Sequence, residues 1–413
     1  MFLLPALSLT TRISVGLVEV VLLLAALGYC RSLWRLRSSD AEWFAATRWI
    51  TLAFLFNLLV ATASLVGTGF DARFFENPSK MLLAALMPAM VLLVRPRAHL
   101  LWFGLSAGTI GAALFAVYQR FVLLMPRAEG FSMPITFGDI AMAMSLMSLA
   151  GIQVSARTRW AALPYLSFVA GVVASILSGS RGGWLAFLLS VFPLYTYGRH
   201  AIKRRSLMII AASVMAVAAV GMLPQTGMLA RMTDVSKEID EYNNGNPDTS
   251  VGARIEMWKG SWLLFAEHPL TGVGRANYNA GLHRLIARGV INPAMQNFQH
   301  AHNEMLNAMA TQGLPGALAL LGIYAAPLLF FSRQLRRPGL HRSYALAGLL
   351  LVLSFIDFGL TQVMFAHHVG SAFYALSVCL LAGLCLQERQ RAVDAPEASS
   401  LRRDAASSQS IAD

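Results

Sequence analysis

Residues 99–118 read HLLWFGLSAGTIGAALFAVY, a run that contains no Asp, Glu, Lys or Arg. An α-helix needs about 20 mainly apolar residues to cross the hydrocarbon core of a bilayer. Further apolar runs lie near residues 13–30, 43–66, 80–94, 136–155, 161–178, 183–198, 206–223, 314–332, 343–361 and 368–386. The chain is therefore predicted to be an all-α polytopic membrane protein with about 11 spans, or about 12 if residues 2–10 form another.

The composition agrees with this fold class. The 413 residues are 56% hydrophobic and 13% charged, whereas a soluble domain carries about 25% charged residues. A net charge of +12 can indicate a nucleic-acid partner. Most of the basic residues, however, lie in short loops between apolar runs, so membrane lipids are the expected surroundings and no nucleic acid is expected. The absence of an internal repeat gives little support to an inverted-repeat transporter.

The basic loops predict the topology. They follow every second apolar run and contain Arg31, Arg35, Arg37, Arg95, Arg97, Arg157, Arg159, Arg199, Lys203, Arg204, Arg205, Arg333, Arg336, Arg337, Arg342, Arg389 and Arg391. By the positive-inside rule these loops are cytoplasmic. The long loop at residues 224–313 then faces the other side, which in a bacterial inner membrane is the periplasm.

Four regions follow from this pattern. Residues 1–223 are expected to form an N-terminal transmembrane bundle, and residues 224–313 a periplasmic loop with short helices and catalytic elements. Residues 314–386 are expected to form the C-terminal transmembrane helices. Residues 387–413 are polar and rich in Ala, Ser and Arg, which predicts a disordered cytoplasmic tail.

A helix is predicted in the long loop after the turn residues 242–248, with Ser250 as its N-cap. Its apolar stripe consists of Ile255, Trp258, Trp262 and Phe265 and is expected to lie on lipid or on the bundle. Arg254 then falls in the first turn, where the helix dipole disfavours a cation. An anion shared between Arg254 and the free N–H groups would explain its place. The alternative is an arginine that reaches to lipid head groups.

A second arginine lies in the connection Ser178-Gly179-Ser180-Arg181-Gly182-Gly183-Trp184, on the predicted periplasmic side. Arg181 opposes the positive-inside bias and directly precedes a predicted helix, which is a favourable place for an anion. Small neighbours allow the backbone to approach a ligand. A tight turn between helices, with Arg181 on a lipid head group, is the structural alternative.

The stretch His300-Ala301-His302-Asn303-Glu304-Met305-Leu306 brings two imidazoles, an amide and a carboxylate together. Leu306, Met309 and Ala310 predict a short helix that Gly313 caps and that Pro315 prevents from simply continuing. Titratable groups are therefore expected at the membrane edge. Asp139 is interpreted as a helix N-cap rather than a functional acid. Gln362, His367 and His368 are expected at the outer mouth of the last helix pair.

These motifs, taken in order, resemble the O-antigen ligase/polymerase superfamily. They are Ser-Gly-Ser-Arg-Gly-Gly at 178–183, Arg254 followed by Trp258 and by His-Pro-Leu-Thr-Gly-Val-Gly at 268–274, and His302-Asn303 followed by Leu306 and Gly313. The specific part of the resemblance covers residues 178–313.

The resemblance implies transfer of a glycan from an undecaprenyl-diphosphate carrier, at the periplasmic face, to a hydroxyl of the lipid A–core oligosaccharide. It also implies that the family is metal-independent, so neither a metal nor a cofactor is expected. Arg181 and Arg254 match the family's essential arginines, and His302 matches its essential histidine. His300 is a less secure catalytic candidate, and Arg275 is a further candidate for a phosphate contact.

The chemistry of these residues agrees with such a reaction. A sugar diphosphate carries a good leaving group, whose developing charge arginine stabilises through paired donors. Histidine titrates near neutral pH and can act as a base for the acceptor hydroxyl, which predicts inversion at the transferred sugar. An O-antigen polymerase and a protein O-oligosaccharyltransferase remain alternatives. So does a polyprenyl-linked glycan flippase, which is not an enzyme and needs no histidine base.

Overall fold

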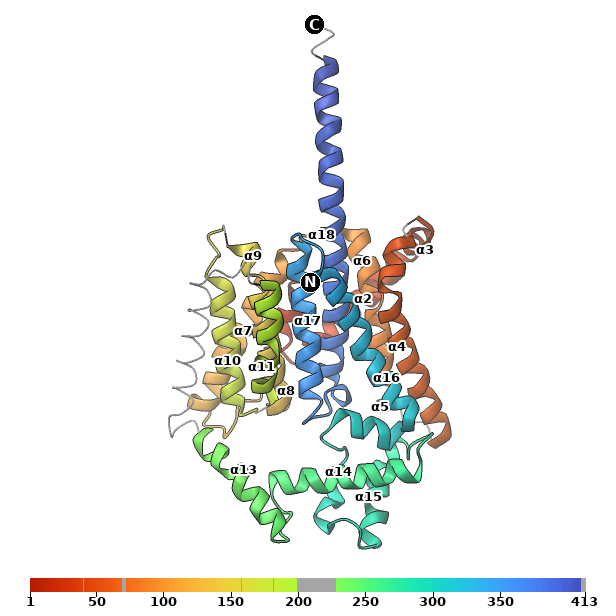
Figure 1. Ribbon diagram of the computed structural model, residues 1–413, viewed down its shortest axis with the longest axis vertical. Coiled ribbons are helices and arrows are strands. Elements are labelled where there is room, and N and C mark those ends of the chain that lie inside the picture. Colours follow the sequence, from red (N-terminus) through yellow and green to blue (C-terminus); the bar gives the residue numbers. More distant parts are fainter. Residues whose placement is uncertain (40, 69–71, 157, 181, 199–227, 410–413) are drawn as a thin grey trace.

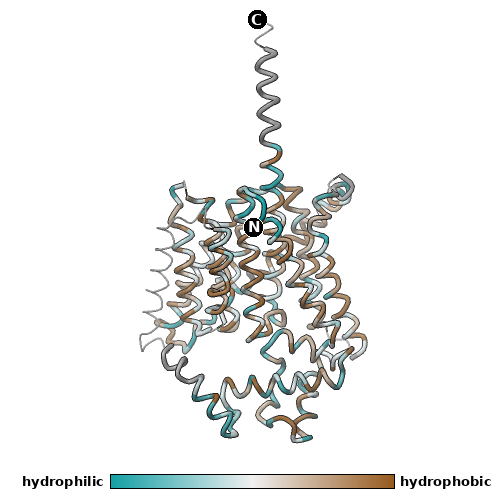
Figure 2. Tube along the Cα trace, in the orientation of Figure 1, coloured by the Kyte–Doolittle hydropathy of each residue, from teal (hydrophilic) through white to brown (hydrophobic). Residues whose placement is uncertain are grey.

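The computed structural model describes residues 1–39, 41–68, 72–156, 158–180, 182–198 and 228–409. These residues contain helices and turns but no β-strand, and the helices stand side by side as a bundle (Figure 1). Among the described residues, six helical stretches are long and apolar enough to cross a membrane, and four apolar helices are shorter. Figure 2 shows that hydrophobic residues dominate the bundle. The predicted all-α polytopic membrane fold is therefore confirmed.

The helices of the bundle coincide with the predicted apolar runs in the described part of the chain. They are α2 (Ser14–Gly28), α4 (Ala41–Thr68), α5 (Ala72–Ala84), α6 (Met87–Val94), α7 (Leu100–Val117), α8 (Pro134–Leu149), α10 (Leu163–Ser178), α11 (Gly182–Gly198), α16 (Glu304–Leu335), α17 (His341–Phe358) and α18 (His368–Gln409). The predicted span 206–223 lies outside the described residues.

One predicted span starts earlier than its apolar run. The run 80–94 is part of a helical stretch from Ala72 to Val94, built from α5 and α6. Its first turns are amphipathic rather than apolar, so hydropathy alone missed them. α6 starts afresh at Met87 with Pro88 in its first turn, where a missing N–H costs nothing.

Residues 2–10 do not form the twelfth span that was considered. Their helix, α1 (Leu3–Leu7), has only five residues and is far too short to cross a bilayer. It packs closely against α7, because a Cβ on Gly104 would lie 2.5 Å from the Phe2 carbonyl oxygen. At Gly108 the corresponding distance to the Pro5 carbonyl oxygen would be 2.0 Å. The absence of side chains at these two glycines is what lets α1 lie on α7.

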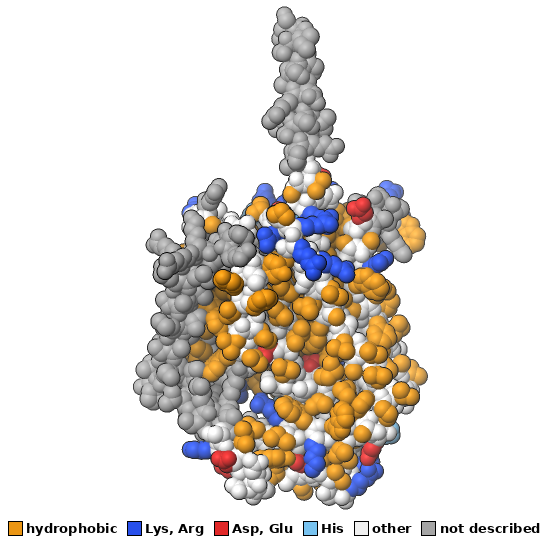
Figure 3. All heavy atoms as spheres, viewed as in Figure 1, with side chains coloured by type: hydrophobic (Ala, Val, Ile, Leu, Met, Phe, Trp, Pro, Cys, Tyr) orange, Lys and Arg blue, Asp and Glu red, His pale blue; other side chains and the backbone are white. Residues whose placement is uncertain are grey.

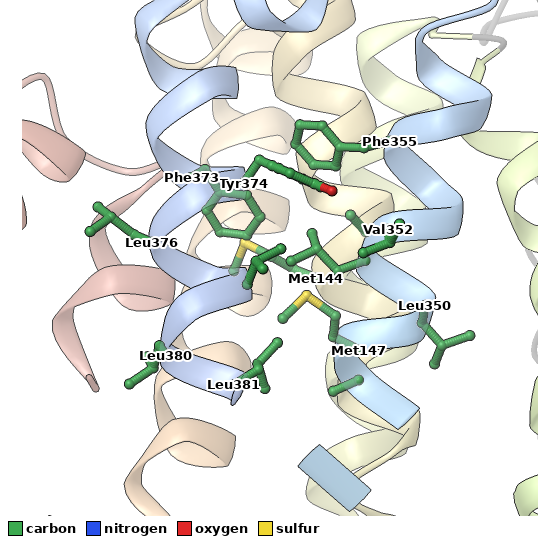
Figure 4. Close-up of a cluster of buried hydrophobic side chains, with 14 of the residues drawn as sticks. Met144, Met147, Leu350, Val352, Phe355, Phe373, Tyr374, Leu376, Leu380 and Leu381 are labelled. Atoms are coloured by element: carbon green, nitrogen blue, oxygen red, sulfur yellow. The ribbon is translucent and has the colours of Figure 1, made fainter. Parts of the chain in front are cut away.

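The centre of the bundle is formed by α17 and α18, whose apolar windows are the most buried of the candidate spans. Figure 4 shows Phe355 of α17 beside Tyr374 of α18, with Met144 of α8 in the same cluster. The rings of Phe355 and Tyr374 lie 4.8 Å apart. Tyr374 also donates a hydrogen bond to the Ile323 carbonyl of α16, at 2.9 Å. A polar hydroxyl in this core is thus paired, as burial in hydrocarbon requires.

The long loop forms a layer of short helices at one end of the bundle (Figure 1). Its elements are α13 (Met228–Asn243), α14 (Ser250–Glu267), the 3₁₀ turn Arg275–Asn277, α15 (Tyr278–Ala287) and the 3₁₀ turn Pro293–Asn297. The basic stretches at α3 (Cys30–Ser39), at the α16–α17 connection and after the apolar part of α18 lie at the opposite end. This separation agrees with the predicted alternation, while the assignment of the α13–α15 end to the periplasm remains a prediction.

The C-terminal segment differs from the expectation. Residues 387–413 were predicted to be disordered, but α18 continues as a helix to Gln409. The segment contains several Ala and Arg residues, which have high helix propensity and extend a helix that the bundle has already nucleated.

The topology can be tested with a single cysteine at the turn after α13. In a Cys30→Ser background, Asn244→Cys is expected to react with a membrane-impermeant maleimide in intact spheroplasts, because Asn244 is exposed at the predicted periplasmic end. Arg336→Cys, exposed at the opposite end, is the matched control and should react only after lysis. Labelling in the reverse order would invert the topology.

Candidate active site

The motif at residues 178–183 forms a tight junction between α10 and α11. Gly179 caps α10 in the left-handed region, with φ +67°. The Ser180 hydroxyl donates a hydrogen bond to Asp139 Oδ1 of α8. Gly182 begins α11, and a Cβ there would lie 3.4 Å from Asp139 Oδ1 and from the Thr361 hydroxyl. Three helices therefore meet at this junction. Arg181 itself lies outside the described residues.

Asp139 is not the helix cap that was expected. α8 begins at Pro134 after Met133, so Asp139 lies in the second turn. Its side chain is completely buried, and it accepts from Ser180 as described above. The interpretation failed because Pro134 starts the helix nearly two turns before the position that an N-cap at Asp139 requires.

The helix that carries Arg254 starts one residue earlier than predicted. Its N-cap is Thr249, whose side chain accepts from the Gly252 amide at 3.0 Å, rather than Ser250. The Val251 amide donates to Glu238 Oε2 of α13 at 2.9 Å. Arg254 consequently lies in the second turn, and two first-turn N–H groups already have side-chain acceptors. The anion shared with free N–H groups of that turn is therefore not supported.

The predicted apolar stripe of α14 is not the face that forms its core. The loop core contains Met257 and Leu264, and the Ser261 hydroxyl is hydrogen-bonded to Tyr278 at 2.7 Å. The stripe residues are Ile255, Trp258, Trp262 and Phe265, and Trp262 is 54% exposed. Helical spacing places the stripe on the side of α14 away from this core. Ile255, Trp258 and Phe265 are half-buried, so within the stripe it is Trp262 that remains available for lipid.

The motif at residues 268–274 packs against the kink in α16. Gly313 has φ +64° in the middle of this helix, which confirms the break that Gly313 and Pro315 predicted. The Val273 amide donates to the Ala310 carbonyl, and the Gly274 amide to the Thr311 carbonyl, both at 2.9 Å. A Cβ on Gly272 would lie 2.3 Å from the Gln312 amide nitrogen. These contacts fix α14 relative to the start of α16.

The histidine loop ends at the N-terminus of α16. Asn303 caps this helix by accepting from the Leu306 amide at 2.9 Å, and it donates through Nδ2 to the Leu360 carbonyl at 3.1 Å. The Glu304 amide donates to the Gly359 carbonyl at 2.7 Å. His302, just before the cap, has φ +48°, a conformation that few non-glycine residues adopt. The loop is therefore fastened to the α17–α18 turn with one strained residue, His302.

Three histidines gather at this point. The ring centres of His300 and His302 lie 4.3 Å apart, and those of His300 and His367 lie 5.9 Å apart. Nδ1 of His300, Nδ1 of His302 and Nε2 of His367 are buried without a hydrogen-bond partner among the described residues. His367 was expected only at the outer mouth of the last helix pair and proves to be part of the cluster.

The surroundings keep these imidazoles neutral. Burial lowers the pKa of His302 to about 4, with a further lowering from the Arg254 charge that the Gln362 side chain opposes. Burial and the two neighbouring histidines lower the pKa of His300 to about 4. Burial also lowers the pKa of His367. At neutral pH a deprotonated His302 can accept a proton but is a weak base until a nearby anion raises its pKa.

A cavity of about 460 Å³ lies between α14 and the bundle, and its lining includes Leu360, whose carbonyl accepts from Asn303 of the histidine loop. It has cationic, acidic and small uncharged side chains in its wall. The lining residues are Arg127, Ile135, Gly179, Ser180, Gly182, Leu185, Glu238, Ser250, Arg254, Asp357, Leu360 and Thr361. Figure 3 shows basic and acidic side chains in the hollow above α14. The cavity thus contains residues of the motif at 178–183 together with Arg254. Leu360 and Thr361 of the α17–α18 turn extend its lining toward the histidine loop.

Arg275 lies in a different environment. It donates to Gln312 Oε1 at 3.4 Å and lines a small buried space with Glu304 and Asn77. Burial lowers the pKa of its guanidinium, and the Glu304 charge opposes this shift. The structure therefore brings Arg254 close to His302 but places Arg275 in the enclosed space beside Glu304 at the start of α16. Its predicted phosphate contact remains a prediction.

Two residues of the cavity were not predicted from the sequence. Arg127 Nε donates to the Ser178 carbonyl at 2.7 Å, so it supports the backbone of the first motif. Asp357 is a buried carboxylate near the end of α17. A charged residue inside an apolar span is a signal for a functional or paired group, and this signal could have identified Asp357.

The described residues contain no group of three or more His, Cys, Asp or Glu side chains arranged to hold a metal ion. Metal independence remains a prediction from the resemblance.

The proximity of Arg254 and His302 gives a measurable prediction. Because the Arg254 charge lowers the pKa of His302, Arg254→Gln is expected to raise that pKa from about 4 toward 6.5. Histidine NMR titration of the substrate-free protein measures the shift. Lys259→Gln, an exposed cation on the same helix, serves as the control. An unchanged pKa in Arg254→Gln would show that burial alone sets it.

Comparisons with known proteins match the part of the chain that contains the three motifs. A family described as O-antigen ligase matches residues 166–321. An uncharacterized protein of Haemophilus influenzae is 24% identical over 333 residues, which cover 79% of this chain and 83% of that protein. An O-antigen ligase of Escherichia coli is 27% identical over 139 residues, which cover 32% of this chain and 30% of that protein. The resemblance predicted from the motifs is confirmed by the match of residues 166–321 to the O-antigen ligase family.

Proposed function

We propose that this chain is an O-antigen ligase of lipopolysaccharide biosynthesis. It transfers a glycan from undecaprenyl diphosphate to a hydroxyl of the lipid A–core oligosaccharide, at the periplasmic face of the bacterial inner membrane. The family domain supports a ligase- or polymerase-type activity. The observation that carries the proposal is the pairing of a neutral His302 with Arg254 beside the cavity, at one end of a membrane bundle.

His302 acts as the base in this proposal. Its neutral imidazole accepts the proton of the acceptor hydroxyl as the oxygen attacks the anomeric carbon of the donor sugar. The bond from that carbon to the diphosphate oxygen breaks, and undecaprenyl diphosphate leaves. Attack from the side opposite the leaving group inverts the anomeric configuration. Arrival of the diphosphate raises the pKa of His302, because the anion offsets the Arg254 charge, and so strengthens the base when substrate is bound.

Arg254 stabilises the leaving group. A guanidinium presents paired donors in a plane that matches phosphate oxygens, and its charge is fixed before the reaction starts. Arg254 is held on a helix whose N-terminus is fastened to Glu238 of α13, so little reorganisation is required. The family resemblance assigns Arg181 to the same task. Asp357 lines the cavity and Asp139 accepts from Ser180, and we assign both to support of the motif at residues 178–183 rather than to contact with the sugar.

A reconstituted transfer assay tests the function. The purified protein is supplied with an undecaprenyl-diphosphate glycan and, in separate reactions, with lipid A–core, a second lipid-linked glycan or an exported acceptor protein. Glycan on lipid A–core is the expected result, and it should persist in excess chelator. Transfer only to a second lipid-linked glycan would indicate a polymerase, and transfer only to protein would indicate an oligosaccharyltransferase. Movement of the donor across vesicles without transfer would indicate a flippase.

His302→Ala is expected to reduce glycan transfer by roughly 100- to 10,000-fold, the range for loss of a general base. Donor binding and folding should be retained. His300→Ala should have a smaller effect if His300 only positions its neighbour. His283→Ala, an exposed histidine of α15, is the control and should transfer normally. Near-normal transfer by His302→Ala, or retention of the anomeric configuration, would refute this role.

Arg254→Ala is expected to lose about 3 kcal/mol of transition-state stabilisation, measured as a fall of about 100-fold or more in kcat/KM. Arg254→Lys keeps the charge without the paired donors and should retain part of the activity. Lys259→Ala on the same helix controls for loss of an exposed cation. Unchanged donor binding and turnover in Arg254→Ala would favour an arginine that only reaches lipid head groups.

A further inference from the structure

A second cavity lies far from the histidine cluster, at the opposite end of the bundle. This groove, of about 690 Å³, runs between α4 and α16, which pack side by side. Its wall is formed by small apolar residues, larger exposed apolar residues and a few polar groups at one end. The lining residues are Ala45, Ala46, Arg48, Trp49, Ile50, Leu52, Ala53, Phe56, Gly322, Ala325, Ala326, Leu329, Phe330, Arg333 and Gln334.

The shape of the groove follows from its small residues. A Cβ on Gly322 would lie only 3.6 Å from the Ala53 Cβ, so the two helices approach each other closely there. Toward the other end the wall is bounded by larger side chains, among them Trp49 and Leu329, which are 57% and 54% exposed. In a membrane-spanning bundle these exposed apolar groups face hydrocarbon. A narrow apolar channel open to the bilayer suits an acyl chain rather than a water-soluble ligand.

The polar end of the groove carries two cations. Arg48 near the start of α4 and Arg333 near the end of α16 both line it, and both are exposed. Neither makes an ion pair with a carboxylate within the described ranges, whereas Arg48 stacks on Trp49 with its guanidinium carbon 5.1 Å from the ring centre. Figure 3 shows basic side chains gathered at this end above an apolar face. Two cations at the head-group level complement a phosphate.

A third polar group supplies an independent observation. Gln334 lines the same groove, its side chain is 8% exposed, and its Oε1 is buried without a hydrogen-bond partner among the described residues. An unpaired buried amide oxygen costs free energy, and a donor from water or from a bound lipid offsets that cost. A lipid head group that bears a hydroxyl provides such a donor beside its phosphate.

We infer that the α4–α16 groove binds an anionic phospholipid whose head group carries a hydroxyl, as in phosphatidylglycerol. The phosphate lies between Arg48 and Arg333, the head-group hydroxyl donates to Gln334, and one acyl chain follows the small residues toward Gly322. The site is independent of the glycan donor, because it lies at the end of the bundle opposite the histidine cluster and shares no lining residue with the cavity beside it.

Native mass spectrometry of the delipidated full chain tests the site, with phosphatidylglycerol and phosphatidylcholine as probes. Phosphatidylglycerol is expected to bind more tightly. Arg48→Gln combined with Arg333→Gln should weaken its binding roughly 30-fold, because each arginine near the surface contributes about fivefold. Arg336→Gln with Arg337→Gln removes the same charge at the same end outside the groove and should have little effect.

Two further variants separate the groove from general surface charge. Ala325→Leu fills the acyl channel and should weaken phosphatidylglycerol binding while every arginine remains. Gln334→Leu should abolish a preference of about fivefold for phosphatidylglycerol over phosphatidylmethanol, which has no head-group hydroxyl. Equal binding of the anionic and zwitterionic lipids, or equal losses in the two double-arginine variants, would overturn the inference. So would undiminished binding in Ala325→Leu.

Discussion

The candidate site depends on the fastening of the α16 N-terminus to the α17–α18 turn. Asn303 and Glu304 bind the Leu360 and Gly359 carbonyls, and Glu304 Oε2 accepts from the Phe365 amide at 3.1 Å. These bonds join two segments that are more than 50 residues apart in the chain. They hold His302 in its left-handed conformation, which a free loop would leave. They also hold the histidine loop next to Leu360, which lines the cavity.

Contacts between distant segments also fix the position of Arg254. One buried carboxylate of α14 joins it to two neighbouring segments, since Glu256 accepts from the Tyr242 hydroxyl of α13 at 2.9 Å and from the Asn292 amide at 2.8 Å. Arg254 therefore stands on a helix that α13, the 3₁₀ turn and the α16 kink all constrain. Fixed charge stabilises a transition state better than charge that must be recruited, because no reorganisation accompanies the reaction. The polar contacts of the loop layer thus serve electrostatic preorganisation as well as folding.

Sequence reasoning could identify the bundle and the motifs because both depend on local patterns. Apolar length predicts a span, and the kink at Gly313 follows from Gly and Pro chemistry. Conformations imposed from far along the chain could not be read in this way. The positive φ of His302 depends on partners in the α17–α18 turn. Arg254 was placed in the first turn because Thr249 and Ser250 are neighbouring cap residues and the sequence pattern favoured the wrong one. The acceptor that Glu238 of α13 supplies to the Val251 amide could likewise not be read from periodicity.

The buried Arg275 contacts α16, the helix whose N-terminus follows the histidine loop. Its guanidinium meets Gln312 just before the Gly313 kink, and Glu304 lies in the same enclosed space. Glu304 is also the first residue of α16, directly after the histidine loop. Its carboxylate therefore connects Arg275 to that loop. A charge buried in a membrane protein is costly unless it is paired, and such pairs hold elements in one arrangement. Arg275 lies in the enclosed space with Glu304 and is not among the residues that line the cavity. Its contribution to glycan transfer is therefore expected to come through the position of α16, whereas Arg254 is expected to contact the phosphate directly.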